Sequence, residues 1–271
     1  MKRVFASDLD QTLIYSHKFL DQLCDKSKEE LEVIEILEGR EISYITKFTK
    51  RKLNELIREN NFIPVTTRTM AQYNRINFES KPLYAITSNG GNILYCGEIL
   101  EEWSQFINEE MTNLSLSINQ VINEVEKYSG EEWLKEWKVA DNLFLYLIIE
   151  REQISLQVIN KFSKWLHSNG WNFSIQGRKV YMIPNCIDKW RALDYIGQRE
   201  KIKSFVTAGD SKLDFSLVNK AKYSIVPKHG KELIDNVQNE KINVTKLDGI
   251  FASNEIIEFS IDKINEIGEK L

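Results

Sequence analysis

The chain has 271 residues, of which 42% are hydrophobic and 28% are charged, so it is long enough for one large globular domain or for a domain with a substantial insertion. Its formal net charge of −4 gives no whole-chain attraction to nucleic acid or to an anionic membrane, so we expect a small soluble ligand and neither of those partners. The three cysteines form no CxxC pair, which argues against a disulfide framework and against a zinc site.

The N-terminal segment MKRVFASDLD turns acidic before the apolar region of a signal peptide can form. No later stretch approaches the ~20 apolar residues that a membrane span needs. These two features predict a cytoplasmic protein. The sequence leaves the oligomeric state open.

The first predicted elements are a strand, a helix and a second strand. Residues 4–9 and residues 62–67 are short apolar runs, and residues 47–60 place apolar side chains on one face of a helix. A crossover of this kind implies parallel strands, and an open parallel sheet binds ligands at the carboxyl ends of its strands. Four polar residues are expected at such ends: Asp8, Asp10, Thr66 and Thr67.

Residues 15–46 form a longer segment than is needed to connect the first predicted strand to the helix at 47–60. They include KEELEVIEILEGREI, for which we predict a solvated amphipathic helix that ends near Gly39, followed by a short extended piece. The sequence assigns this insert no role.

The middle of the chain has a different pattern. Residues 83–87 form a third predicted strand, and NILYCGEIL is a predicted hairpin in which Gly97 supplies the turn. Amphipathic segments at about 101–128 and 152–168 then alternate with the apolar runs LFLYLIIE, WNFSIQ and KVYMIP. This is an α+β pattern.

After Pro184 the parallel pattern resumes, with helices predicted at 188–198 and 213–220 and strands at 204–208 and 223–226. The predicted fold class is therefore α/β, with a doubly wound, Rossmann-like parallel sheet as the core and an inserted α+β domain. The core is expected at residues 1–88 and 184–271, and the inserted domain at residues 89–183.

Acidic residues follow two of the predicted strands. Asp8 and Asp10 follow the first strand, and Asp210 and Asp214 follow the strand at 204–208. Like charges this close raise one another's pKa unless a cation lies among them. Mg²⁺ prefers hard oxygen ligands and often binds through carboxylates together with a substrate phosphate. The sequence therefore predicts a Mg²⁺ site.

An aspartate at such a site can attack a phosphoryl group and form an aspartyl-phosphate, while a neighbouring carboxylate transfers the proton. A lysine and a hydroxyl group can neutralise and hydrogen-bond the phosphoryl oxygens, and Lys189 and Thr66 are the candidates. Taken alone, each acidic pair is explained equally well by turn formation or helix capping.

Four segments, in order, resemble the signatures of the haloacid dehalogenase-like (HAD) hydrolases: DLDQT, PVTTR, the lysine of IDKWRAL, and GDSKLD. Their spacing is similar to that of the subgroup whose cap domain, of the C2 type, lies between the second and third signatures. This resemblance implies that residues 89–183 are the cap domain. The segments SNGGNILYCGEIL and VYMIPNCIDKWRAL further resemble the Cof-type and sucrose-phosphatase-like branch.

The resemblance implies a Mg²⁺-dependent phosphatase that hydrolyses a small phosphorylated metabolite, with sugar phosphates as the leading substrate class. It implies that Asp8 is the nucleophile and Asp10 the general acid and base. It also implies that Thr66 and Lys189 bind the transferring phosphoryl group. The implied substrate-binding residues are Thr66, Thr67, Arg68 and Lys189. The implied metal ligands are Asp8, Asp10 (through its backbone carbonyl), Asp210 and Asp214, the last of which completes or orients the site.

Three residues depart from the family pattern without removing a reactive group. Gln11 stands where glycine is common, Thr67 where many relatives have glycine, and Leu213 where many have asparagine. The three histidines, at positions 17, 167 and 229, have no metal-ligand spacing and are expected in surface or packing positions.

Two other functions stay open at this point. A phosphosugar mutase-like phosphotransferase would use the same residues. A non-catalytic sensor of a phosphorylated ligand would keep the fold, although binding alone requires neither a nucleophile nor an adjacent proton donor.

Overall fold

The computed structural model describes residues 3–21, 23–237 and 242–266. The chain forms two compact units, one made of Met1–Ile99 with Lys189–Leu271 and the other of Leu100–Asp188. The boundaries expected from the sequence, with the inserted domain at residues 89–183, stay a prediction. Each unit is described by itself below.

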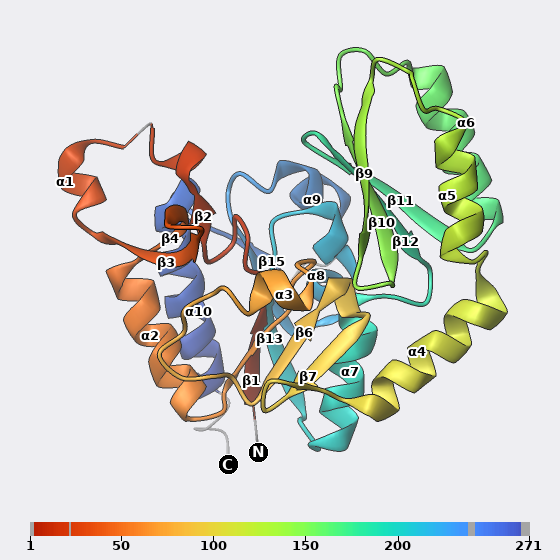
Figure 1. Cartoon of the computed structure of the whole chain (residues 1–271). Helices are drawn as coiled ribbons and strands as arrows, with labels where there is room; N and C mark the ends of the chain where they lie inside the picture. The colour runs from red at the N-terminus through yellow and green to blue at the C-terminus, as the bar shows by residue number, and fades with distance from the viewer. Residues whose placement is uncertain (1–2, 22, 238–241, 267–271) are drawn as a thin grey trace. The chain divides into compact units, whose positions relative to one another are not determined.

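The first unit contains the parallel sheet and the elements around it (Figure 1). Its elements before residue 100 are β1 (Arg3–Ser7), β2 (Tyr15–Ser16), η1 (His17–Phe19), α1 (Asp25–Lys28), β3 (Leu31–Leu37), β4 (Arg40–Thr46), α2 (Lys47–Arg58), β5 (Phe62–Pro64), α3 (Met70–Tyr73), β6 (Tyr84–Thr87), η2 (Ser88–Gly90), β7 (Asn92–Tyr95) and β8 (Glu98–Ile99). Its later elements are α7 (Lys189–Arg199), β13 (Ser204–Ala208), η3 (Lys212–Asp214), α8 (Phe215–Lys220), β14 (Tyr223–Val226), α9 (Lys231–Asn236), β15 (Ile242–Val244), η4 (Gly249–Phe251) and α10 (Ala252–Glu266).

The central sheet has the strand order β15-β14-β13-β1-β5, and every neighbouring pair in it is parallel. Strand β1 is buried along Val4, Phe5 and Ala6, because α2 and α10 cover one face of the sheet and α7 and α8 the other (Figure 1). From β1 the chain continues to β5 on one side, whereas β13, which comes later in the sequence, lies on the other side of β1. The carboxyl ends of these three strands therefore lie at a topological switch point of the sheet. The predicted α/β fold class is confirmed.

Helix α2 shows why the sequence folds as it does next to this sheet. The side chain of Thr46 accepts a hydrogen bond from the backbone N–H of Thr49 at 3.0 Å and so caps the first turn. Leu53, Leu56 and Ile57 are buried against the core. The helix ends at Arg58, shortly before a residue in the left-handed conformation.

The predicted helix within residues 28–39 is wrong, because these residues contribute to a β-hairpin. Strand β3 pairs antiparallel with β4, and Glu38 and Gly39 close the turn with φ angles of 51° and 74°. Two consecutive left-handed residues are typical of the tight hairpin turn that matches strand twist. The β-branched residues of the LEVIEIL run also favour a strand over a helix.

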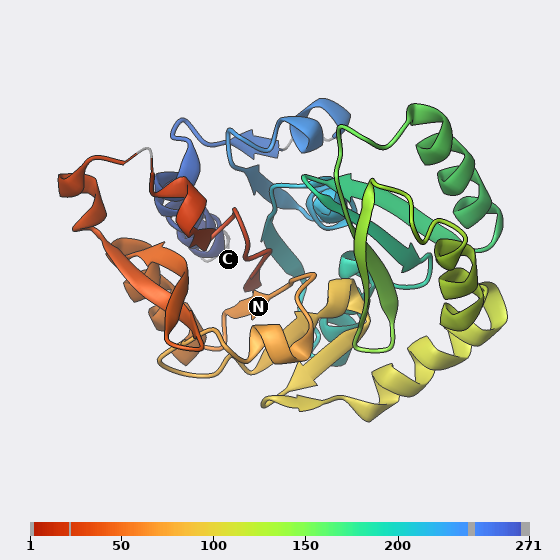
Figure 2. The ribbon, with the colours of Figure 1, turned by 45° about the horizontal axis from the view of Figure 1, so that its top comes forward.

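The hairpin is held against the rest of the first unit through its connection to α2. In both ribbon views the red and orange segments around β4 lie beside the blue helix α10 (Figure 2). The hydroxyl groups of Thr49 and Ser253 lie 3.0 Å apart, and Thr49 also donates to Asn254 Oδ1 at 3.0 Å. Thr46, the last residue of β4, donates from Oγ1 to the same Asn254 Oδ1 at 2.5 Å, so the hairpin is joined directly to α10 within this unit.

The second unit is an antiparallel sheet with three helices packed around a common core. Its elements are α4 (Glu101–Leu114), α5 (Ile118–Glu126), β9 (Leu134–Ala140), β10 (Phe144–Ile149), α6 (Leu156–Ser168), β11 (Trp171–Gln176) and β12 (Lys179–Pro184). The sheet order is β11-β12-β10-β9, and Trp103 and Trp171 are fully buried. The predicted inserted α+β arrangement is confirmed.

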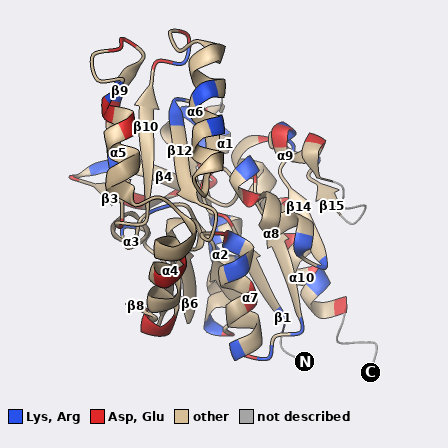
Figure 3. Cartoon of the chain, turned by 90° about the vertical axis from the view of Figure 1, so that its right-hand side faces the viewer, with Lys and Arg blue, Asp and Glu red and all other residues tan. Residues whose placement is uncertain are grey.

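Residues of both charge signs occur along the ribbon of each unit (Figure 3). Helix α4 is an exception, because its sequence EEWSQFINEEMTNL contains acidic residues and no lysine or arginine. In the described part of the chain, no helix is both long enough and apolar enough to span a membrane.

Candidate active site

The segment that follows β1 turns back on itself at the carboxyl edge of the sheet. The backbone N–H of Asp8 donates to the carbonyl of Ala208 at 2.9 Å, and the N–H groups of residues 12, 13 and 14 all donate to the carbonyl of Leu9. Gln11 has a φ of 61°, a left-handed conformation that glycine adopts without steric cost, which is consistent with the glycine of the family pattern at this position. Nε2 of His229 lies 2.7 Å from the carbonyl oxygen of Gln11. This histidine packs beside the loop, as expected, and the sequence did not predict which group it contacts.

Lys189 joins the two acidic segments. It is the first residue of α7, is buried, and donates from Nζ to Oδ1 of Asp8 at 2.7 Å and to Oδ1 of Asp214 at 2.6 Å. Burial opposes the charge, but the carboxylates of Asp214 and Asp8 outweigh it and hold the pKa of Lys189 above its ordinary value. The structure thus brings together three of the residues singled out from the sequence.

Asp214 is held from both sides of its carboxylate. Oδ1 accepts from Lys189, and Oδ2 accepts from the backbone N–H groups of Asp210 and Ser211 at 3.2 and 3.0 Å and from Ser211 Oγ at 2.9 Å. These contacts engage both oxygens, so the geometry favours Asp214 as a residue that orients the cluster. Gly209 makes room for it, because a Cβ atom at residue 209 would lie 2.4 Å from Cβ of Asp214 and 2.6 Å from Cγ.

Replacing Gly209 by Ala is expected to displace the Asp214 side chain. A methyl group in this space forces Asp214 or the backbone to move, which we expect to lower the free energy of unfolding by about 1–3 kcal/mol. Affinity for the Mg²⁺ that the sequence predicts at this site is expected to fall as well, because Asp214 fixes Lys189 and the backbone of Asp210. Urea unfolding and Mg²⁺ titration calorimetry would check this. A Gly209→Ala variant with unchanged stability and affinity would contradict the geometry.

Three carboxylates gather at this edge of the sheet: one oxygen each from Asp8, Asp210 and Asp214 lies within 4.8 Å of the others. Burial, reinforced by the charge of Asp214 and opposed by Lys189, raises the pKa of Asp8 from 3.8 to about 7. Burial and the charges of Asp8 and Asp214 likewise raise the pKa of Asp210. The negative charge exceeds what Lys189 neutralises, so the cluster suits a cation.

The raised pKa of Asp8 predicts a pH dependence of stability in metal-free protein. Between pH 3.8 and about 7 the folded state binds more protons at Asp8 than the unfolded state, so this group lowers the free energy of unfolding as the pH rises through that window. The slope is expected to reach about 1.4 kcal/mol per pH unit at most. The measurement is urea unfolding in EDTA at several pH values, with Asp8→Asn as the variant that lacks this titration. If both proteins have the same slope, the pKa of Asp8 is not raised.

Thr66 and Thr67 follow β5 at the same sheet edge. Thr66 is buried, donates its backbone N–H to the carbonyl of Ile86 at 2.8 Å, and accepts at Oγ1 from the backbone N–H of Arg68 at 3.1 Å. Thr67 donates from Oγ1 to Oδ1 of Asn89 at 3.2 Å. These bonds fix the segment next to η2.

Asp10 is separate from the carboxylate cluster. Arg68 clamps its carboxylate, with Nε and Nη2 donating to the two oxygens at 2.7 Å each. The third nitrogen of Arg68, Nη1, donates to Glu35 on the β3–β4 hairpin at 2.8 Å. Arg68 was predicted as a substrate contact, whereas Glu35 was not predicted at the site, because it was expected on a solvated helix. The β-branched residues Val33, Ile34 and Ile36, followed by a Glu-Gly turn, were the local signal that favoured a strand, although they do not alternate strictly.

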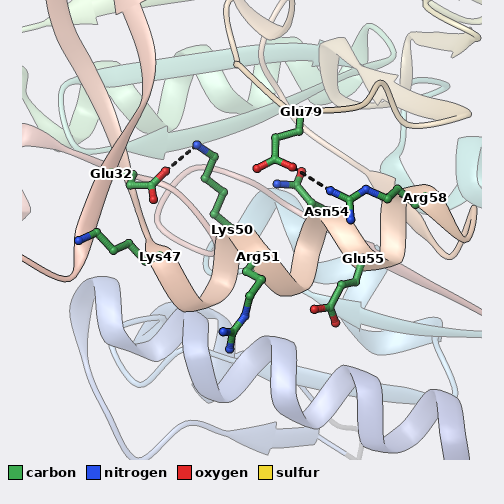
Figure 4. A pocket seen from close by; sticks show the side chains of 8 residues that line it. All are labelled: Glu32, Lys47, Lys50, Arg51, Asn54, Glu55, Arg58 and Glu79. Atoms are coloured by element: carbon green, nitrogen blue, oxygen red, sulfur yellow. Dashed lines mark hydrogen bonds and ion pairs between the residues drawn. The ribbon is translucent and has the colours of Figure 1, made fainter.

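The pocket drawn in Figure 4 lies elsewhere in the first unit. It has a volume of about 250 Å³ and extends along α2, between the ion pairs Lys50–Glu32 and Arg58–Glu79. Its lining residues are Glu32, Lys47, Lys50, Arg51, Asn54, Glu55, Arg58 and Glu79. None of the residues predicted to be catalytic, metal-binding or substrate-binding lines it.

The family model described as sucrose-6F-phosphate phosphohydrolase matches residues 1–261. The chain belongs to this family. Members of the family are HAD-type phosphatases, so the resemblance deduced from the four signatures is confirmed and the chain is a phosphatase. No curated protein matches the chain by sequence.

Solved structures of low sequence identity show the same fold. The sucrose-phosphatase from Synechocystis sp. PCC6803, in complex with sucrose and phosphate, has a TM-score of 0.68 and 16% identity over 98% of this chain and 99% of its own. A HAD/COF-like hydrolase from Plasmodium vivax has a TM-score of 0.59 and 14% identity over 97% and 96%. A trehalose-6-phosphate phosphatase related protein has a TM-score of 0.57 and 12% identity over 98% and 100%.

Proposed function

We propose that this phosphatase uses Mg²⁺ and hydrolyses a small phosphorylated metabolite, with sugar phosphates as the leading class, through an aspartyl-phosphate on Asp8. The observation that carries the proposal is the buried Asp8 carboxylate, bound to Lys189 at 2.7 Å and within 4.8 Å of oxygens of Asp210 and Asp214. The sucrose and phosphate bound to the structurally similar Synechocystis enzyme support the substrate class.

Asp8 is the proposed nucleophile, and its surroundings suit that role. Lys189 holds Oδ1, which leaves Oδ2 with a longer 3.3 Å hydrogen bond from the Thr12 hydroxyl. Oδ2 is therefore the less constrained oxygen and the one we expect to attack phosphorus. The fixed ammonium of Lys189 also neutralises charge on the phosphoryl oxygens, and the buried setting makes this interaction stronger than in water.

Mg²⁺ fits the donor set, because hard carboxylate oxygens with excess negative charge are the ligands that it prefers. Asp8 and Asp210 would hold it, together with the backbone carbonyl of Asp10, while Asp214 orients the cluster through Lys189 and Ser211. When bound, the ion neutralises phosphoryl oxygens and lowers repulsion between the phosphate and the attacking carboxylate.

Asp10 is the proposed proton-transfer residue, two positions after the nucleophile. It protonates the leaving alcohol in the first step and takes a proton from water in the second. Thr66, at the end of β5, is the proposed hydroxyl donor to the phosphoryl group, and Thr67 and Arg68 are the proposed neighbouring substrate contacts. The second unit is the proposed cap, which selects the leaving group and excludes water.

Phosphate release from a panel of phosphorylated sugars, nucleotides and cofactor precursors, with and without Mg²⁺, tests the proposal. We expect release that requires Mg²⁺ and that is fastest with one class of sugar phosphate. A mutase would instead return the phosphoryl group to a sugar, which product analysis of the same reactions would detect. Binding without release or transfer from any compound would contradict the proposed function.

A further inference from the structure

We propose that Glu35, on the β3–β4 hairpin, is a positioning residue that orients the Asp10 carboxylate through Arg68. This inference rests on the proposed function of Asp10 in proton transfer. It gives the insert at residues 15–46, which the sequence left without a role, a part in the reaction.

Glu35 is a fully buried carboxylate with three donors. Its side chain is 0% exposed, Oε2 accepts from Ser43 Oγ at 2.7 Å and from Arg68 Nη1 at 2.8 Å, and Oε1 accepts from Arg75 Nε at 2.9 Å. Burial alone would raise the pKa of Glu35, but the Arg68 charge and these hydrogen bonds outweigh it and lower the pKa. A buried carboxylate is tolerated because two guanidinium groups compensate it.

The backbone of the hairpin is shaped to turn Glu35 inward. The register of the β3–β4 pair shifts on both sides of Glu35, which lies opposite Ser43, the residue that donates to it. Such bulges re-aim a side chain within a strand. The carbonyl of Ile34 accepts from the N–H of Asn77 at 2.8 Å, and Glu35 forms a bridge with Ile76. The hairpin is thus tied to the segment that carries Arg75.

Arg68 connects the buried carboxylate of Glu35 to the half-exposed carboxylate of Asp10. Its guanidinium is planar, so fixing Nη1 on Glu35 sets the direction in which Nε and Nη2 point. Those two nitrogens each donate to Asp10 at 2.7 Å. The Arg68 side chain is 11% exposed, whereas that of Asp10 is 49% exposed. Glu35 therefore acts from the interior on a carboxylate that neighbouring protein atoms leave half exposed.

Glu35 also forms an ion pair with Arg75, and this contact provides a matched control. Arg75 binds Oε1 of Glu35, and no hydrogen bond or ion pair seen in the described residues joins it to Asp10. An effect on Asp10 should therefore follow from Glu35→Gln and not from Arg75→Gln, although both variants break the ion pair between Arg75 and the buried Glu35 carboxylate.

The test compares leaving groups. p-Nitrophenyl phosphate has a leaving group that needs little protonation, whereas a sugar phosphate requires a proton from Asp10. Because kcat/KM reports events up to the first irreversible step, it isolates the step in which Asp10 acts as an acid. For Glu35→Gln we expect kcat/KM to fall about 10–100-fold with the sugar phosphate and less than about 3-fold with p-nitrophenyl phosphate. For Arg75→Gln we expect equal, small changes with both.

A second variant keeps the test decisive where Glu35→Gln folds poorly. Ser43→Ala removes one hydrogen bond to Glu35 and a longer one that Ser43 Oγ accepts from Arg68 Nη2 at 3.3 Å. It leaves the charge of Glu35 paired, so the same leaving-group difference is expected at a smaller magnitude. Equal losses with both substrates, in proteins with the wild-type folded fraction, would mean a structural role and would overturn the proposal.

A crystal structure of Glu35→Gln provides an arm that does not depend on activity. We expect the two-bond contact between Arg68 and Asp10 to be lost or lengthened; a contact kept at its present geometry would overturn the positioning role. This separates two failures. A wild-type protein that hydrolyses neither substrate would refute the proposed function, and the variant structure would still decide whether Glu35 positions Asp10.

Discussion

Replacing Asp8 by Asn is expected to lower kcat with the best phosphomonoester substrate by at least about 10⁴-fold, a size typical of lost nucleophiles. The amide of asparagine is nearly the same size as the carboxylate, but it is a poor nucleophile and does not attack phosphorus to form the acyl-phosphate. The variant is expected to retain ligand binding, since the hydrogen bonds that position Asp214 and Thr66 do not depend on Asp8. Steady-state phosphate release and calorimetric titration of the substrate measure the two effects.

The matched control for this change is Asp194→Asn on α7. Asp194 accepts a hydrogen bond from Gln198 at 2.7 Å, lies outside the carboxylate cluster, and should keep full activity when it is changed. Substantial turnover by a correctly folded Asp8→Asn variant, beyond any trace of wild-type contamination, would exclude Asp8 as the nucleophile.

Replacing Lys189 by Met is expected to lower the free energy of unfolding by about 3–5 kcal/mol above pH 7. The Lys189 side chain is 1% exposed, and its ammonium group lies between two carboxylates, Asp8 and Asp214, that are themselves buried. Without it, both carboxylates remain buried without a compensating charge. The free energy of unfolding should recover partly at lower pH, because protonation removes the uncompensated charge on Asp8. It should also recover partly when Mg²⁺ is added, because the ion compensates the same negative charge. Urea unfolding at pH 5 and pH 8 measures this.

A lysine of similar size in a more exposed pair provides the comparison. Lys52 pairs with Glu55 on α2, and both side chains are partly exposed, so Lys52→Met is expected to cost no more than about 1 kcal/mol. If Lys189→Met were as mild as Lys52→Met at pH 8, then the buried cluster would not depend on this ammonium. Activity is expected to disappear in the Lys189 variant in either pH condition, because the phosphoryl oxygens lose their fixed cation.

Apolar runs that end in polar residues were enough to predict the core of the fold. Strands β1 and β13 are such runs. Because parallel strands expose their carboxyl ends at one edge, the gathering of Asp8, Asp210 and Asp214 followed from topology. The contact of Lys189 with this cluster followed from the family resemblance. Neither step required knowledge of side-chain geometry.

The hairpin at residues 31–46 could not be predicted in the same way. The buried charge of Glu35 and the register shifts beside it disturb the alternation of apolar and polar residues that marks a strand. The spacing of the glutamates along the segment therefore favoured an amphipathic helix. The partners of Glu35 and Asp10 are also distant in sequence, with Arg68 58 residues after Asp10. Such long-range pairs depend on the folded chain and leave no local pattern.

A covalent phosphoryl group on Asp8 is the central claim of the proposed mechanism. The measurement is rapid acid quench of the Mg²⁺-loaded enzyme during turnover of its best substrate, followed by mass spectrometry of the peptide that carries residues 8 and 10. We predict the mass of one added phosphoryl group on Asp8, its loss on treatment with hydroxylamine, and its absence from Asp8→Asn. Phosphorylation at another residue during full turnover would contradict the account.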